Sequence, residues 1–97
     1  MVIVYSKTTC PHCVQAKKLL ESHNIKYTDI NIEEDMIAKD FIIQKGHKSV
    51  PQFYVGDNIL VEGGFTGLRG MARTAIESKV AELIWLNLKR VRFTVLN

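Results

Sequence analysis

The two cysteines of the chain, Cys10 and Cys13, are separated only by Pro11 and His12. Thiols at this spacing fit half of a metal site, a disulfide, or a dithiol that exchanges disulfides. A tetrahedral zinc site needs two further ligands, and none of the 3 histidines has a zinc-finger spacing from the pair. We therefore expect redox chemistry at these cysteines and no metal.

Length and composition indicate the setting in which these thiols work. The 97 residues predict one domain, and an apolar fraction of 46% is ordinary for a globular protein. No apolar run is long enough to span a membrane, and residues 1–5 have the pattern of a strand and not of a signal peptide. We expect a cytoplasmic protein, in which a lasting structural disulfide is disfavoured. A net charge of +3 is a mild excess, so we expect no nucleic-acid partner. We also expect a monomer without a membrane partner.

Apolar periodicity predicts an α/β fold in the order β-α-β-α-β-β-α, with a four-stranded mixed sheet flanked by helices. The expected strands are 2–5, 25–32, 52–55 and 59–61, and the expected helices are 11–22, 36–45 and about 66–89. The helix between the first two strands implies that they are parallel, and the turn at 56–58 implies an antiparallel hairpin. We expect the second strand to be mostly buried.

The predicted domain covers residues 1–89, and residues 90–97 form a basic C-terminal tail of unknown role. The sequence fits a frayed tail, a strand or an interaction arm, and it does not decide between them.

The predicted elements place Cys10 where a loop meets the first helix, with Cys13 one turn further on. Unpaired N–H groups and the helix dipole stabilise a thiolate at a helix N-terminus, so we expect the pKa of Cys10 to fall below about 8.5. We therefore assign Cys10 as the attacking nucleophile. Cys13 is the resolving thiol, which breaks a mixed disulfide by closing the Cys10–Cys13 bond.

Neighbouring side chains are expected to tune this pair. Pro11 removes a competing N–H group and stiffens the turn, while His12 brings a positive charge or a hydrogen-bond donor near the Cys10 sulfur. Lys7, three residues before Cys10, either adds positive potential or is an ordinary solvated lysine. A stabilised thiolate makes the disulfide a better oxidant, so we expect a reduction potential at the oxidising side of about −200 to −230 mV.

Four segments in this order resemble the glutaredoxin family, within the thioredoxin-like fold. Residues 4–7 precede the Cys-Pro-His-Cys motif, Ser49–Gln52 is similar to the family's Thr-Val-Pro segment with its proline in cis, and Gly63–Thr66 is similar to its Gly-Gly turn. The resemblance extends over about residues 2–85.

The resemblance implies that the protein reduces protein disulfides and glutathione mixed disulfides, with glutathione as the reducing cosubstrate. Residues assigned to glutathione are Lys7, Gln44, Val50, Pro51, Gly64, Phe65 and Thr66. Backbone groups of Val50 pair with a peptide-like substrate, as an added strand would. N–H groups at Phe65 and Thr66 hold the γ-glutamyl carboxylate, while Lys7 and Gln44 face the glycyl carboxylate.

Two departures from the family pattern keep alternatives open. The position of His12 is often tyrosine in glutaredoxins, and Cys-Pro-His-Cys is typical of periplasmic disulfide oxidases, which carry a large insertion. Thr66–Gly67 stands where acidic residues usually follow the Gly-Gly turn. One alternative is a redoxin that thioredoxin reductase reduces and that serves ribonucleotide reductase, of a compact kind common in bacteriophages. The other is a glutaredoxin that binds an iron–sulfur cluster with glutathione and Cys10.

Overall fold

A computed structural model describes the backbone of residues 1–96 and the side chains of residues 1–88. The elements along the chain are β1 (Val2–Ser6), α1 (Pro11–Ser22), β2 (Tyr27–Asn31), α2 (Met36–Gln44), β3 (Gln52–Val55), β4 (Asn58–Val61), α3 (Gly64–Arg69) and α4 (Arg73–Leu96). The predicted α/β class and the four strands are confirmed. Among the described residues, no helix combines the length and the apolar composition needed to cross a bilayer.

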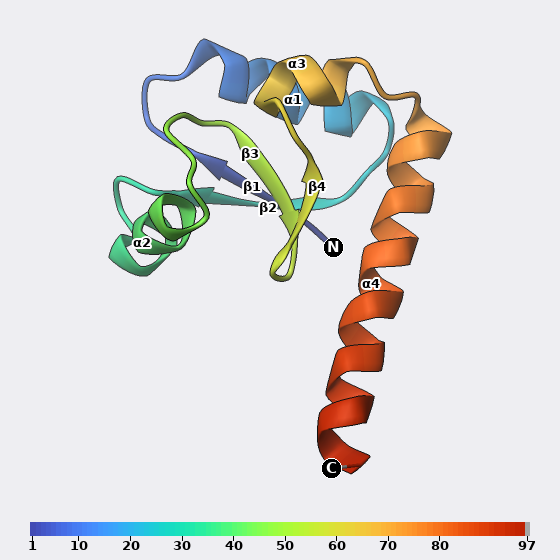
Figure 1. Ribbon diagram of the computed structural model, residues 1–97. Helices are drawn as coiled ribbons and strands as arrows, with labels where there is room; N and C mark the ends of the chain where they lie inside the picture. Colours follow the sequence, from blue (N-terminus) through green and yellow to red (C-terminus); the bar gives the residue numbers. More distant parts are fainter. Residues whose placement is uncertain (97) are drawn as a thin grey trace.

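The four strands form one mixed sheet in the order β2-β1-β3-β4 (Figure 1). β1 is parallel to β2 across the α1 crossover, and β3 is antiparallel to both β1 and β4. The hairpin between β3 and β4 turns at Gly56, whose φ of +61° lies in the left-handed region that favours glycine. Both predicted pairings, the parallel pair and the hairpin, are confirmed.

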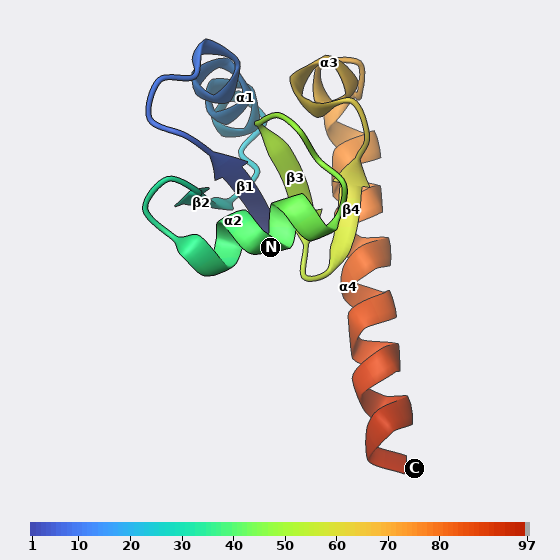
Figure 2. The same ribbon diagram turned by 60° about the vertical axis from the view of Figure 1, so that its left-hand side comes forward.

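Helices cover the sheet on both faces, so two apolar clusters form (Figure 2). The larger cluster lies between the sheet and the helices α1, α3 and α4, and its buried residues are Val2, Val4, Ala16, Leu20, Phe53, Val55, Leu60, Leu68, Ile76 and Leu83. The smaller one lies under α2 and comprises Tyr5, Ala38, Ile42 and Tyr54. Alternate residues of β1 and β3 point to opposite faces, which is why Val4 and Tyr5 belong to different clusters.

The prediction that the second strand is mostly buried is wrong. β2 is an edge strand, and Thr28 and Asp29 are exposed on it. The apolar pattern of 25–32 arises because Ile25 and Tyr27 pack on the larger cluster, while Ile30 and Ile32 pack on the smaller one. An edge strand buries such residues only in part.

The prediction of one helix over 66–89 is also wrong. The chain forms two helices that break at Gly70, where the backbone N–H donates to the Gly67 carbonyl oxygen at 3.2 Å. The break lets α3 cross the end of the sheet beside α1 while α4 runs along β4 (Figure 1). As a result Leu68 and Ile76 are both fully buried.

The end of α4 also differs from the prediction, because the helix continues to Leu96 and not to Lys89. The predicted tail, residues 90–97, lies outside the described side chains, and its role stays untested. Within the described part, Asn87 fixes α4 to the β3–β4 turn. Its amide donates to the Val55 carbonyl oxygen at 3.3 Å and accepts from the Asn58 amide at 2.9 Å.

Candidate active site

The two cysteines form a disulfide at the N-terminus of α1. Cys10 is the N-cap residue, Pro11 occupies the first turn, and the Cys13 backbone N–H donates to the Cys10 sulfur at 3.2 Å. The predicted positions of all three residues are confirmed. Cys10 is 8% exposed and Cys13 only 1%, so an incoming sulfur reaches Cys10 first. This asymmetry agrees with the assignment of Cys10 as the attacking thiol.

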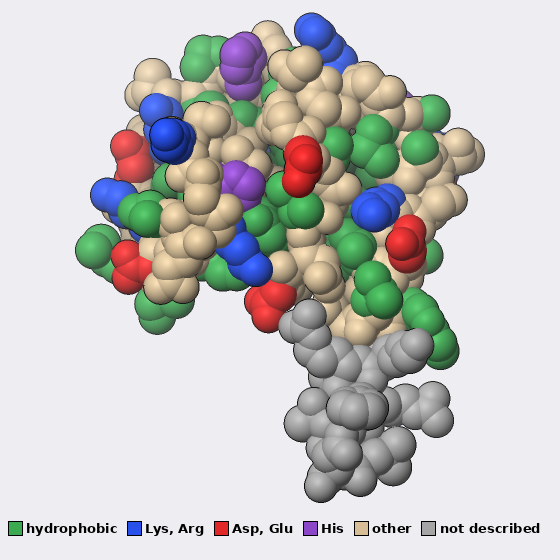
Figure 3. All heavy atoms as spheres, in the orientation of Figure 1, with side chains coloured by type: hydrophobic (Ala, Val, Ile, Leu, Met, Phe, Trp, Pro, Cys, Tyr) green, Lys and Arg blue, Asp and Glu red, His purple; other side chains and the backbone are tan. Residues whose placement is uncertain are grey.

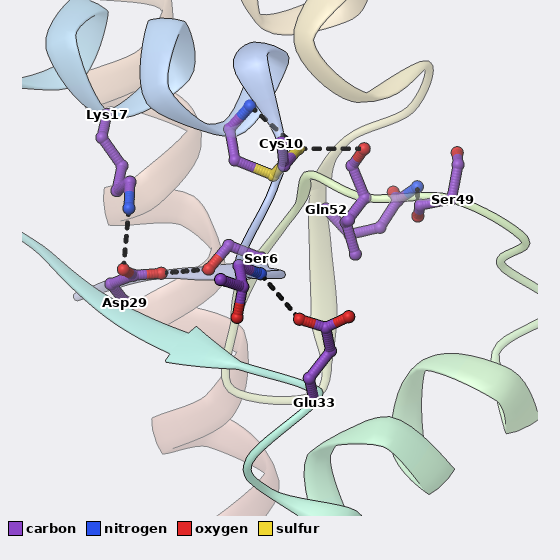
Figure 4. Close-up of a disulfide and its surroundings, with 10 residues drawn as sticks. Ser6, Cys10, Lys17, Asp29, Glu33, Ser49 and Gln52 are labelled. Carbon is purple, nitrogen blue, oxygen red and sulfur yellow. Dashed lines mark hydrogen bonds and ion pairs between the residues drawn. A yellow bond between two sulfur atoms is a disulfide. The ribbon is translucent and has the colours of Figure 1, made fainter.

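The loop before β3 faces this disulfide. The peptide bond between Val50 and Pro51 is cis, as the family resemblance implies. The Val50 carbonyl oxygen lies 3.8 Å from the Cys10 sulfur, a contact drawn in Figure 4. When Cys10 is reduced, its thiol can donate a weak hydrogen bond to this oxygen. The backbone of Val50 is thereby placed beside the reacting sulfur.

A polar network fixes the strand that leads into the cysteine loop. The Asp29 carboxylate accepts hydrogen bonds from the Ser6 hydroxyl at 2.6 Å and from the Lys17 ammonium at 2.8 Å (Figure 4). Burial raises the pKa of Asp29, but these two hydrogen bonds outweigh it, and the pKa lies below its ordinary value. The network joins β1, β2 and α1. Its only sign in the sequence is Asp29, which stands at a position where the alternating pattern of residues 25–32 would place an apolar residue.

A groove of about 490 Å³ opens on one side of the Val50–Pro51 bond. Of the predicted site residues it is lined by His12, Val50, Pro51, Gly64, Phe65 and Thr66. The backbone turns into this groove at Gly63 and Gly64, whose φ angles of +86° and +58° favour glycine. The structure therefore brings together residues that are up to 54 positions apart in the sequence.

Two stacked rings line this groove next to the disulfide, and a guanidinium lies near one of them. The His12 imidazole stacks on the Phe65 ring with centroids 5.9 Å apart and an interplanar angle of 22°. Arg69 places its guanidinium carbon 5.8 Å from the same Phe65 ring. Among the described contacts, the His12 ring therefore has an aromatic partner and makes no hydrogen bond to the Cys10 sulfur. The predicted electrostatic effect of His12 on that sulfur stays a prediction.

Glu62 lines the same groove, and sequence reasoning missed it. It is the only acidic residue on the groove's lining, and its carboxylate has no hydrogen bond or ion pair with any described residue. The position where the family has its second acidic residue is closed to side chains. A Cβ atom on Gly67 would lie only 1.9 Å from the Glu62 carbonyl oxygen. The single signal in the sequence is that Glu62 directly precedes the Gly-Gly turn.

A second groove, of about 270 Å³, lies on the other side of Val50. Lys7 lines it, as does His47, whose Nε2 atom lies 2.6 Å from the Tyr54 hydroxyl. Gln44, which the resemblance assigns to glutathione, is an exposed residue at the end of α2 and is not on the lining of either groove. The part of the chain with described side chains holds no group of three or more metal-binding residues.

Comparison with known proteins identifies the family. The glutaredoxin family model matches residues 2–60, which is more than half of the chain. The chain belongs to the glutaredoxin family. Glutaredoxin 1 of Rickettsia felis is 38% identical over 65 residues, 64% of this chain and 63% of that protein. The glutaredoxin-like protein NrdH of Lactococcus lactis is 39% identical over 51 residues, 53% of this chain and 71% of that protein.

Solved structures agree on the glutaredoxin fold. The holo form of glutaredoxin C1 from poplar (Populus tremula x tremuloides) superposes with a TM-score of 0.66 at 22% identity, over 86% of this chain and 78% of that one. A buckwheat glutaredoxin–glutathione complex superposes with a TM-score of 0.60 at 23% identity, over 84% and 74%. At these identities the likeness shows the fold alone. The chain spans only 63% of the length of the Rickettsia relative.

Proposed function

We propose that this glutaredoxin is a cytoplasmic thiol-disulfide oxidoreductase that uses glutathione to reduce protein disulfides and glutathione mixed disulfides. One observation carries the proposal: a groove open to solvent joins Val50, whose carbonyl oxygen lies 3.8 Å from the more exposed sulfur of Cys10, to the Gly63–Gly64 turn. A tripeptide thiol laid along Val50 would have its sulfur at Cys10 and one end at that turn.

Reduction of a substrate begins with the Cys10 thiolate. It attacks one sulfur of the substrate disulfide, the S–S bond breaks, and the other substrate sulfur leaves as a thiolate. Cys13 then attacks the Cys10 sulfur, which releases the second substrate thiol and closes the Cys10–Cys13 disulfide. The hydrogen bond from the Cys13 backbone N–H to the Cys10 sulfur at 3.2 Å stabilises negative charge on Cys10 before the attack.

Two glutathione molecules complete the cycle. The first attacks Cys10, releases the Cys13 thiolate and leaves glutathione bound to Cys10. The second attacks the glutathione sulfur of this adduct, releasing Cys10 and glutathione disulfide. Buried Cys13 cannot be the first point of attack, because it is only 1% exposed.

The two ends of glutathione differ in charge, and the two grooves that share Val50 differ in charge as well. The γ-glutamyl end of glutathione carries both a carboxylate and an ammonium group, so it needs donors and an acceptor. We assign the carboxylate to the N–H groups of Phe65 and Thr66, and the ammonium to Glu62, which lines the same groove and is unpaired. The glycyl carboxylate faces Lys7 in the second groove. Glu62 thus does the work of the acidic residues that are missing at Thr66–Gly67.

The test is to reduce the oxidised protein with two electron donors side by side. One is glutathione with glutathione reductase, the other is thioredoxin reductase, and a small disulfide is the final acceptor in both. We expect fast NADPH consumption with glutathione. Turnover only with thioredoxin reductase would overturn the glutathione dependence, and no turnover with either would overturn the oxidoreductase function.

A second candidate donor has a specific observation in its favour. Thr66–Gly67 replaces the usual acidic residues, and the L. lactis relative carries the name of a glutaredoxin-like protein, NrdH. If thioredoxin reductase is the donor, Glu62 has no ligand to bind. Ribonucleotide reductase is a candidate protein substrate under either donor, and it rests on the family resemblance alone.

A further inference from the structure

The second groove extends well beyond the residue assigned to glutathione. It begins at Ser49 and Val50, beside the Cys10 sulfur, and continues over α2. Of the basic residues that line it, the proposed glutathione cycle uses only Lys7. Two further lysines, Lys39 and Lys48, line it, and no part of the proposed glutathione cycle uses them.

The floor of this groove is apolar. Ile32, Ile42 and Ile43 line it, and Ile43 keeps 58% of its surface exposed although it is large and apolar. The neighbouring Met36 and Ile37 on α2 are 69% and 84% exposed. Apolar and basic side chains lie together over α2 on the left of Figure 3, with acidic ones among them. Several large apolar side chains exposed close together are typical of a binding site for another chain.

The rim of the groove is basic. Lys7, Lys39 and Lys48 line it, no acidic residue does, and none of the three forms an ion pair with a described residue. Hydrogen bonds from Thr8 have the larger effect in lowering the pKa of the nearby Glu33 carboxylate, and Lys7 and Lys39 help to lower it further. The lining itself carries three lysines and no carboxylate, so it has an excess of positive charge.

The apolar floor and the basic rim together indicate what kind of chain segment the groove binds. We propose that the groove binds the segment next to the reactive cysteine of a protein substrate, and that it selects segments with an apolar residue and acidic side chains. The isoleucines take the apolar side chain, and Lys39 and Lys48 take the carboxylates. A strand advances about 3.3 Å per residue, so the selected residues lie within about three positions of the cysteine. Glu62 lines the groove on the other side, so the preference applies to one side of the cysteine only.

The inference rests on the proposed oxidoreductase function, and the test separates the two. Four peptides of equal length carry either Ile-Glu-Glu or Ile-Lys-Lys, before or after a cysteine held as a mixed disulfide with thionitrobenzoate. The Cys10 thiolate attacks the peptide sulfur, the S–S bond breaks, and coloured thionitrobenzoate leaves. Cys13 then displaces the peptide thiol. The rate of colour release is measured with reduced protein, together with a single blocked cysteine that lacks any flanking residues.

We expect the acidic triplet to be about fivefold faster than the basic one on one side of the cysteine and not on the other. The Lys39→Gln/Lys48→Gln variant loses this preference, and so does wild type in 1 M salt. The matched control Lys18→Gln/Lys26→Gln keeps it, because these exposed lysines do not line the groove. All variants react equally with the single blocked cysteine.

Equal rates for all four peptides, or an acidic preference of the same size on both sides, would overturn the inference while the oxidoreductase function stands. If no probe reacts, the proposed function fails. The groove is then judged by fluorescence anisotropy with labelled peptides that carry serine in place of cysteine. Weaker binding of the acidic peptide to Lys39→Gln/Lys48→Gln supports the groove, and unchanged binding rejects it.

Discussion

Two grooves meet at the backbone of Val50, and they differ in charge and in lining. One runs toward the Gly63–Gly64 turn and contains a single unpaired carboxylate, Glu62, with the stacked rings of His12 and Phe65. The other runs over α2 and has an isoleucine floor under three lysines. Under the proposed function the same sulfur serves both grooves, so glutathione is oriented by its charges: its γ-glutamyl ammonium and carboxylate lie at the groove of Glu62, and its glycyl carboxylate lies at the groove of Lys7.

The shared sulfur is the most sensitive point of this arrangement. Cys10→Ser is expected to remove turnover through both grooves, by at least about a thousandfold, because no other described thiol is exposed. Cys13→Ser should still reduce glutathione mixed disulfides, since that reaction needs only Cys10. Both variants are assayed with a glutathione mixed disulfide and with a protein disulfide. A Cys13→Ser protein that is inactive on the first substrate would contradict the assigned roles.

A substitution at Gly67, which packs against the backbone of Glu62, should disturb the groove that Glu62 lines and leave the groove over α2 unchanged. Gly67→Asp is expected to destabilise the fold by about 2–3 kcal/mol, because its Cβ would lie 1.9 Å from the Glu62 carbonyl oxygen, a backbone atom that cannot rotate away. Thr66→Asp is the control, as this exposed position has room, and it should change stability by less than about 0.5 kcal/mol. Urea unfolding measures both. Equal stability of the two variants would show that this close approach has no energetic importance.

The charge of Glu62 can be removed with little change in shape. Glu62→Gln is expected to raise the KM for glutathione about fivefold at unchanged kcat, the effect of one exposed charge-assisted hydrogen bond. A glutathione analogue without the amino group should show no difference between the two proteins. Glu77→Gln, on α4 and outside this groove, is the matched control. The same KM for glutathione in wild type and Glu62→Gln would mean that the ammonium is bound elsewhere.

The smallest effect is expected at the His12 ring. His12→Tyr should make the disulfide less oxidising by roughly 10 mV, about a twofold change in the equilibrium constant with glutathione. The effect is small because the imidazole stacks on Phe65, with centroids 5.9 Å apart, and no described hydrogen bond joins it to sulfur. Equilibration with glutathione redox buffers measures the potential. An unchanged potential would show that His12 contributes to the groove wall and not to the redox balance.

Local signals in the sequence predicted the parts of the site that depend on neighbouring residues. The position of Cys10 at a helix N-terminus and the turn at Gly63–Gly64 follow from a few adjacent residue types, the cis bond before Pro51 follows from the family resemblance, and the structure confirms all three. The same applies to most of the secondary structure, because each strand and the first two helices have a clear apolar period.

What the sequence did not predict depends on contacts between distant segments. In the sequence Glu62 is an ordinary loop residue, and only the fold places it on the same groove as Val50. Lys39 and Lys48 likewise come together only across the α2–β3 connection. The break at Gly70 was missed because the apolar residues on both sides fit one helical period, although they pack in different places. The edge position of β2 likewise depends on strand order, which a single strand does not contain.

The close packing of Gly67 against the Glu62 backbone has a consequence for protein engineering. The second acidic position of the glutaredoxin pattern cannot be grafted onto this chain by one substitution, since the backbone has to move before a side chain fits. Thr66 is the position where a designer can add charge to this groove without rebuilding the turn. The Glu62 carbonyl oxygen, and not the ligand, therefore decides which substitutions must come first: the backbone has to be moved before an acidic residue can replace Gly67.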